Sequence, residues 1–459
     1  MRLAFLVPLG FAAGAILCRL LLLKAPSTFA VDRAQPLAVV TYWGNFGALM
    51  FLALVVAIAI ASVGYAFALR RRDTLRTTVI WSALACAAAL FFPVVFSRDA
   101  YAYAGYGLMA LHGLNPYAHA AVTMRGPLMD AVLWQWGNPP PACVYGPAFV
   151  WFAQAVVTIF AGFGPAAPLW AFRIGACAAL VLCAPLASAT FAQGSARART
   201  AAAAGIALNP VAIWAAAEGH NDVYLIAIVL AGFALIARAR PFTGAVVVAL
   251  SALVKAPGLL AAAAAPLMFA GSRARSRVLT GTLLGLAVAA AIGSPALRQL
   301  SRNSGHGIYF PQFSLQYVLN SAFGAPAAIV LSVAIAVALA AFGCLLLWRK
   351  NGSGAPLIAL SLWIAVPNPY PWYALWILPV AFVEWETPAA WAIVALTLGS
   401  LVRYLPDATT DLSTPLSVAI ALAPLAIAAA VFIACRRRLR SGLPENHTPA
   451  PDSALYRFP

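Results

Sequence analysis

Long apolar stretches separated by short polar turns follow one another along the whole chain. They lie near residues 4–22, 44–69, 77–96, 146–163, 168–191, 201–217, 221–237, 241–254, 257–270, 279–296, 326–347, 355–367, 372–384, 388–402 and 414–434. Several approach or exceed the roughly 20 residues that cross a bilayer as a helix. Backbone amides cannot stay unpaired in lipid, so we expect these stretches to be helices. The pattern predicts an all-α, polytopic membrane protein with about 12–14 transmembrane helices.

Some stretches fit this pattern less simply. The pair 241–254 and 257–270, split by "VKAPG", reads as two half-helices or one broken span. If 146–163 and 168–191 both crossed, a basic cluster would lie outside, so we expect one of the two to be re-entrant or to lie flat. The N-terminal stretch lacks a clear cleavage site and is interpreted as a retained first span. We expect one transmembrane domain over 1–440 and a disordered cytoplasmic tail over 441–459.

The distribution of arginines predicts how the chain is oriented in the membrane. Only 9% of the chain is charged, yet the net charge is +17. Arginines cluster in short turns between apolar stretches, at 70–76, 196–199, 237–240, 271–277, 348–350 and 435–440. This is the positive-inside pattern of cytoplasmic loops and argues against nucleic-acid binding. It places both termini in the cytoplasm and the segment 97–145 outside. The seven scattered Cys form neither a disulfide framework nor a metal pattern.

Three acids stand at the mouths of apolar helices: Asp99, Glu218 and Asp222. Ionisable groups at the edge of the hydrocarbon are usually functional or paired. Asp99 opens a stretch rich in aromatic and polar residues, "SRDAYAYAGYGLMALHGLNPYAH" (97–119). The other two acids belong to "WAAAEGHNDVYLIAIVLAG" (214–232), at a Gly-marked break between two apolar stretches.

This grouping suits transfer of a sugar at the membrane surface. A carboxylate can act as general base on an acceptor hydroxyl, aromatic and His side chains can hold a sugar, and a cation can hold a phosphate leaving group. Lys255 is the most suggestive cation, because it is the only Lys within an apolar stretch. With Asp99 as the predicted base, the candidate substrate-binding residues are Arg98, Tyr101, Tyr103, His112, Asn115, Tyr117, Tyr145, Glu218, His220, Asn221, Asp222, Lys255, His306, Asn368, Trp372 and Tyr373.

Each of these residues also has a plainer interpretation. Asp99 could only pair with Arg98 or cap a helix, and Glu218 to Asp222 could form an interfacial turn. Lys255 could snorkel to the surface, and the aromatic residues of 367–380 could form an interfacial belt. Their joint occurrence on one predicted face favours a site.

Five blocks carry a resemblance: "SRDAYAYAGYG…HGLNPY", "VYGPAF", "WAAAEGHNDVYLIAIVLAG", "ALVKAPGLL" and "PNPYPWYALWILPV", in that order over 97–380. They resemble the GT-C class of multi-span glycosyltransferases that use polyprenyl-phosphate sugars, in particular the polyprenol-phosphomannose-dependent α-1,6-mannosyltransferases and their GT87-like relatives. The resemblance implies that Asp99 is the base and that the reaction inverts the sugar. It implies a polyprenyl-phosphate donor, mannose favoured, and a glycan or glycolipid acceptor. No cofactor is expected, and a divalent metal is not favoured.

Two other function classes stay open. A flippase or transporter would show repeat symmetry and midplane charges, and the sequence has no convincing repeat. A ligase or polymerase would transfer a whole glycan from a diphosphate-linked donor. For the glycosyltransferase, we expect a multi-pass protein of the inner or plasma membrane whose site faces the periplasm or cell exterior.

Overall fold

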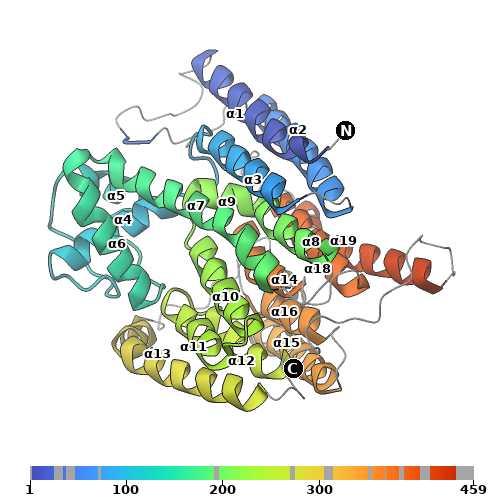
Figure 1. Cartoon of the computed structure of the whole chain (residues 1–459). Coiled ribbons are helices and arrows are strands. Elements are labelled where there is room, and N and C mark those ends of the chain that lie inside the picture. The colour runs from blue at the N-terminus through green and yellow to red at the C-terminus, as the bar shows by residue number, and fades with distance from the viewer. Residues whose placement is uncertain are drawn as a thin grey trace.

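The computed structural model of the chain describes residues 3–24, 35–37, 47–70, 74–190, 196–268, 274–303, 314–349, 354–366, 369–381, 387–403 and 414–440. Within these residues the regular elements are α-helices and short 3-10 helices, with no strand (Figure 1). The predicted all-α class is therefore confirmed. The predicted tail at 441–459 lies outside the described residues.

Six helices are long and apolar enough to cross a membrane. They are α1 (Leu6–Lys24), α2 (Gly47–Arg70), α7 (Ala166–Thr190), α13 (Arg275–Asn303), α15 (Ala325–Trp348) and α19 (Thr414–Arg440). Shorter apolar helices are α3 (Leu75–Leu90), α6 (Pro147–Phe160), α10 (Asp222–Ala237), α11 (Pro241–Leu250), α12 (Gly258–Met268), α16 (Gly354–Ala365) and α18 (Pro388–Gly399). The chain is a multi-pass membrane protein. The total of 12–14 crossings stays a prediction.

The bundle packs neighbouring helices pairwise. In Figure 1, α1, α2 and α3 lie side by side above α7, and α10 to α13 lie below it. A second group, α4 (Asp99–Leu111), α5 (Pro127–Trp136) and α6, stands together at the left end of the view. The segment 97–145, predicted as an external loop, therefore contains two helices. Both α4 and α6 pack against α7, which connects this group to the bundle.

The apolar stretch 201–217 is not one straight helix. It divides into α8 (Ala196–Ala207) and α9 (Pro210–Glu218), which are bent by 44° and form a seventh crossing if they are one span. Pro210 lacks the N–H that would continue α8. Asn209 caps α9 by accepting hydrogen bonds from the N–H groups of Val211 (2.9 Å) and Ala212 (3.4 Å). Its side-chain amide donates to Tyr65 and Thr397, so the bend is fixed by buried polar contacts.

The two ambiguous pairs have different outcomes. The stretch around "VKAPG" forms two short helices, α11 and α12, separated by the 3-10 helix η4 (Ser251–Leu253) and by Lys255. Of the other pair, α7 is long enough to cross a membrane, and α6 belongs to the shorter apolar helices. That one of the two is re-entrant or lies flat stays a prediction.

In several helices one end lies next to arginines and the other end lies next to the acids of the cluster. α3 begins beside Arg76 and ends at Leu90, before Asp99. The α8–α9 pair begins beside Arg197 and Arg199 and ends at Glu218. In the opposite direction, α10 begins at Asp222 and α12 begins just after Lys255, and basic segments follow both helices. The acids and the arginine clusters therefore occupy opposite ends of the same helices.

Candidate active site

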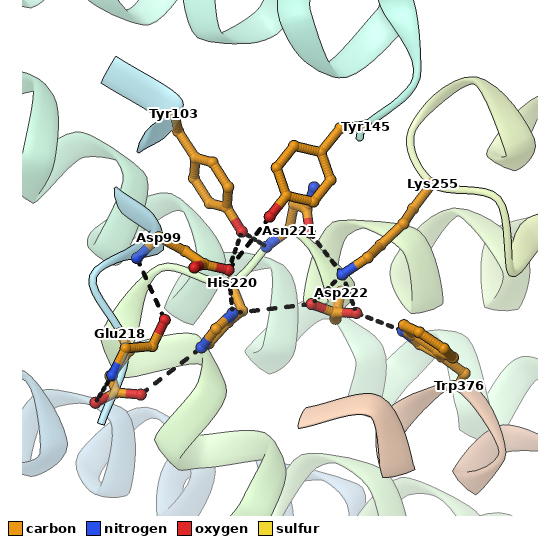
Figure 2. Close-up of polar contacts among 10 residues, drawn as sticks. Asp99, Tyr103, Tyr145, Glu218, His220, Asn221, Asp222, Lys255 and Trp376 are labelled. Atoms are coloured by element: carbon orange, nitrogen blue, oxygen red, sulfur yellow. Dashed lines mark hydrogen bonds and ion pairs between the residues drawn. The ribbon is translucent and has the colours of Figure 1, made fainter. Parts of the chain in front are cut away.

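Asp99 is the first residue of α4 and lies at the centre of a polar cluster (Figure 2). Its Oδ2 accepts hydrogen bonds from the hydroxyls of Tyr103 and Tyr145, each at 3.3 Å, and lies 3.3 Å from Nδ1 of His220. Among the described residues Oδ1 has no hydrogen-bond partner. The Asp99 side chain is 18% exposed, so this carboxylate is both held and accessible.

Helical spacing and one close backbone contact assemble this group. Tyr103 is four residues after Asp99 and so shares its face of α4. Tyr145 precedes Gly146, whose N–H donates to the carbonyl of Val254 at 3.0 Å. A Cβ on Gly146 would lie 2.1 Å from the carbonyl oxygen of Leu253. Only glycine permits this approach, which brings Tyr145 close to Lys255.

His220 is fully buried and faces three carboxylates. Besides Asp99, its Nε2 lies 3.7 Å from Oε2 of Glu218 and its Nδ1 lies 3.9 Å from Oδ2 of Asp222. The turn that makes this possible is Gly219, a left-handed C-cap at φ 87° that ends α9. Trp372 stacks on the imidazole with 4.1 Å between ring centroids. The aromatic stack and the acids together fix the ring.

Glu218 fixes the segment that precedes Asp99. Its Oε1 accepts hydrogen bonds from the backbone N–H groups of Phe96 (3.0 Å) and Ser97 (3.3 Å). Ser97 in turn accepts from the N–H of Asp99 at 3.2 Å. The predicted turn at 218–222 is present, and the carboxylate it presents positions the neighbouring chain.

Lys255 and Asp222 form a buried ion pair. The Lys255 ammonium lies 2.8 and 2.9 Å from the two Asp222 oxygens and donates to Oδ1 of Asn221 at 3.3 Å. The rings of Tyr145, Tyr373 and Trp376 surround it, with centroids 5.0–5.3 Å away. Trp376 also donates its indole N–H to Asp222. Lys255 therefore does not snorkel; it sits in an aromatic cage.

The charges of the cluster support one another. Burial alone would raise the pKa of the Asp99 carboxyl, but His220 and Lys255 lower it below its usual value. Burial alone would lower the pKa of His220, but contacts with Asp99 and Glu218 raise it to about 9. At neutral pH the cluster therefore holds an ionised Asp99 against a protonated His220.

Arg173 supports the cluster from α7 and is buried. It donates through Nε to the carbonyl of Ala217, and through Nη2 to the carbonyls of Leu90 (3.2 Å) and Phe92 (3.3 Å). It thus joins the C-terminal ends of α3 and α9. The sequence analysis overlooked both Arg173 and Trp376. The available signals were an arginine inside an apolar stretch and the second Trp of "PWYALW".

Not all predicted residues join this cluster. Tyr103, Tyr145, Glu218, His220, Asn221, Asp222, Lys255, Trp372 and Tyr373 meet around Asp99. His112 and Asn115 are exposed beyond the far end of α4, about 20 Å along the helix from Asp99.

The other predicted residues near α4 lie apart from these contacts. Tyr117 follows the same turn as Asn115. Tyr101 is buried and accepts the N–H of Leu37 at 3.3 Å. Arg98 is half-buried beside Asp99 and forms no ion pair with a described residue. His306 and Asn368 lie outside the described residues.

The acids are not arranged as a metal site. Within the described part of the chain, no three His, Cys, Asp or Glu side chains are grouped so that they could hold a metal ion. Asp99, Glu218 and Asp222 instead face His220 from different directions.

The fold and this cluster define a multi-pass membrane protein with an acid–histidine site at the ends of its helices. The family model described as "Alpha-(1->6)-mannopyranosyltransferase, N-terminal domain" matches residues 3–271, and the chain belongs to this family. The matched region contains Asp99, Tyr145, His220 and Lys255. It ends before the aromatic segment with Trp372.

The comparison with curated proteins gives the same family name. Alpha-(1->6)-mannopyranosyltransferase A of Mycobacterium tuberculosis is 33% identical over 187 residues, which are 39% of this chain and 34% of that relative. The alignment thus spans about a third of the relative's length. No solved structure matches the chain.

Proposed function

We propose that this protein transfers an α-mannosyl residue from a polyprenyl-phosphate donor to a hydroxyl of a glycan or glycolipid, with Asp99 as general base. The observation that carries the proposal is the state of Asp99. It is an ionised carboxylate, partly exposed, in a cluster that also contains Glu218 and Asp222. Family membership supports the mannosyl group and the GT-C class.

The chemistry follows from the contacts of Asp99. Both tyrosine hydroxyls and His220 engage Oδ2, so Oδ1 is the oxygen that receives the acceptor proton. As that proton leaves, the acceptor oxygen attacks the anomeric carbon and the bond from that carbon to the phosphate oxygen breaks. Polyprenyl phosphate departs and the anomeric configuration inverts. A positioned general base of this kind contributes about 10²–10⁴-fold.

Cations near Asp99 serve the leaving group. Lys255 is one cation of the cluster besides the protonated His220, and one tyrosine, Tyr145, contacts both Lys255 and Asp99. A sugar bound against Tyr145 would therefore place its acceptor side at Asp99 and its phosphate side at Lys255. Arg98, half-buried beside Asp99, is the second candidate cation. His220, with no exposed surface, acts behind Asp99 as a positioning residue and does not contact the substrate.

The polarity of the helices supports a site on the external face. Arginine clusters mark cytoplasmic ends, and the cluster around Asp99 occupies the opposite ends of α3, α9, α10 and α12. Both termini would then be cytoplasmic. A polyprenyl-phosphate sugar presented in the outer leaflet would reach the cluster from the bilayer.

The proposal is tested by release of polyprenyl phosphate. Purified protein in lipid is incubated with a panel of polyprenyl-phosphate sugars and a mannoside acceptor, wild type beside Asp99→Asn. We expect release with the mannosyl donor and loss of about 10²–10⁴-fold in the variant. Asp130→Asn is the matched control, because Asp130 is an exposed residue of α5 whose partner is Arg125.

Each alternative predicts a different result. A near wild-type rate of release in Asp99→Asn would show that Asp99 is not the general base. If a folded wild-type protein releases nothing from any monophosphate donor, a diphosphate-linked donor or lipid translocation becomes the better explanation. Both can be assayed in the same vesicles.

A further inference from the structure

An open groove lies between α1 and α3, two helices at the edge of the bundle (Figure 1). Its volume is about 470 Å³, and ligand pockets commonly measure about 300–1,000 Å³. Six apolar side chains and one arginine line it: Ala12, Ala15, Ile16, Leu20, Ala88, Phe91 and Arg19. The groove therefore combines an apolar surface with a cation.

The groove opens toward the lipid around the bundle. Ile16, Leu20 and Phe91 are large apolar side chains that the rest of the chain leaves exposed. α1 is one of the helices long and apolar enough to cross a membrane. Between the large side chains, the alanines of α1 and α3 leave a hollow. Hydrocarbon is the surrounding that suits such a surface.

Arg19 lies at the end of the groove where α1 and α3 finish. Its Nε donates to the carbonyl of Phe91 at 2.8 Å. Among the described residues no carboxylate pairs with Arg19, and its two terminal nitrogens have no hydrogen-bond partner. Charged side chains within transmembrane segments ordinarily have a partner. The half-buried guanidinium therefore offers a positive charge and two donors to an anion from outside the chain.

The length of the groove matches one leaflet. From Ala12 to Leu20 the lining covers about 12 Å along α1. Half of a hydrocarbon core is about 15 Å thick. The arginine end of the groove is the end at which α3 stops, before the segment that leads to Asp99. An acyl chain in the groove would thus stay in the leaflet on the side of the active site, with its phosphate at Arg19.

The groove is separate from the candidate active site. No residue of the cluster around Asp99 lines it. The packed rings of Phe92, Phe96 and Trp214 lie between α3 and that cluster. An occupant of the groove therefore does not reach Asp99, and it is not the sugar donor in its reacting position.

The groove nevertheless touches the chain that carries Asp99. Two arginines bind three successive carbonyls at the end of α3: Arg173 binds Leu90 and Phe92 from inside the bundle, and Arg19 binds Phe91 from the groove. Cations at this position also suit the negative end of a helix. An anion that fixes Arg19 would therefore help to fix the end of α3.

We propose that the groove between α1 and α3 binds one anionic phospholipid, with an acyl chain along the alanines and the phosphate at Arg19. The unpaired cation at one end of an apolar groove of one-leaflet length carries this inference. It goes beyond the proposed function and does not depend on it.

A photoreactive lipid tests the location. The probe is a phosphatidylglycerol with a diazirine on one acyl chain, incorporated into vesicles with the wild-type protein. We expect crosslinked peptides from α1 and α3 that excess phosphatidylglycerol competes away and phosphatidylcholine with the same acyl chains does not. Equal competition by both lipids would mean ordinary contact with the bilayer and would overturn the inference. Preferential competition by polyprenyl phosphate would assign the groove to a different lipid.

Three variants sharpen the test. Arg19→Gln removes the charge, and we expect it to weaken crosslinking about tenfold, since a hydrogen bond to a charged group is lost. Ala88→Phe fills the groove and should weaken crosslinking as well. Ala87→Phe is the matched control, because it places the same ring at the exposed neighbouring position outside the groove. Equal crosslinking in all three variants contradicts the inference. If Arg19→Gln does not fold, Ala88→Phe and Ala87→Phe still decide the outcome.

Thermal unfolding in detergent gives a second readout. A ligand that binds the folded state raises its unfolding midpoint. Phosphatidylglycerol should therefore raise the midpoint of the wild type and of Ala87→Phe more than that of Arg19→Gln or Ala88→Phe. The same rise in all four proteins would argue against a specific site. Because no sugar transfer enters either measurement, the lipid site and the transferase proposal can fail separately.

Discussion

The two halves of the site use the same residue type in opposite ways. Asp99 is 18% exposed and receives hydrogen bonds from two neutral phenols, with His220 beside it. Asp222 has no exposed surface and is held by the Lys255 ammonium and the Trp376 indole. Both carboxylates have a cation beside them, but only the partly exposed Asp99 can be reached by a substrate hydroxyl, whereas Asp222 is enclosed by its partners. The difference separates a base from an anchor.

His220 connects the two halves. Its Nδ1 lies 3.3 Å from Asp99 and 3.9 Å from Asp222, and so it adds positive charge beside both. Because Asp222 already has Lys255, the histidine charge acts mainly on Asp99. The Lys255–Asp222 pair thus leaves the positive charge of His220 to stabilise the ionised form of Asp99.

The largest effect on folding should come from removing the anchor. Asp222→Asn leaves the buried Lys255 ammonium without its counter-charge, and breaking such a pair costs about 3–5 kcal/mol. Thermal unfolding in detergent should show a strong loss for Asp222→Asn and little change for Asp99→Asn. Adding Lys255→Met should restore much of the loss. Equal stability of both aspartate variants would erase the distinction between base and anchor.

The phenols should have a smaller effect, and on rate. Tyr103→Phe and Tyr145→Phe each remove one hydrogen bond to Oδ2 of Asp99, a type of bond worth about 1.5–3 kcal/mol when one partner is charged. We expect kcat to fall about tenfold or more and the pKa of Asp99 to rise, seen as a shift of the acid limb of the rate profile. Tyr317→Phe, on α14 (Leu315–Phe323), is the control. No rate change in either cluster variant would argue against this support.

The contribution of His220 should appear in the pH dependence of stability. The pKa of His220 is raised from 6.5 to about 9 by the surrounding acids. A raised pKa stabilises the folded state fully below about pH 6.5 and loses that contribution as the pH rises through about 9. The unfolding midpoints of wild type and His220→Gln should therefore converge above pH 9. A gap that is constant over this range would mean that His220 is not protonated in the folded protein.

The apolar pattern predicts the class of fold well, because lipid forces every crossing segment to be helical. It predicts the bends poorly. The break at Pro210 depends on Asn209 reaching Tyr65 and Thr397, residues distant in the sequence. Such contacts leave no local signal beyond the proline itself.

The acids at the helix ends are predictable for a similar reason, since a charge beside hydrocarbon needs a partner. For the other predicted site residues, closeness to Asp99 in the sequence does not predict closeness in the structure. His112 and Asn115 belong to the same quoted block as Asp99, yet a helix carries them about 20 Å away. Tyr103, one turn from Asp99, stays near. Trp376 and Arg173 enter through tertiary contacts that a single sequence does not display.

Arg173 makes the two acid-bearing segments mechanically one piece. Its guanidinium binds carbonyls on both sides, Leu90 and Phe92 before Asp99, and Ala217 before Glu218. Displacing either segment relative to the other would break charge-assisted hydrogen bonds of a buried guanidinium. We therefore expect the ends of α3 and α9 to move together with α7, and an opening that admits a substrate to involve other elements around the cluster.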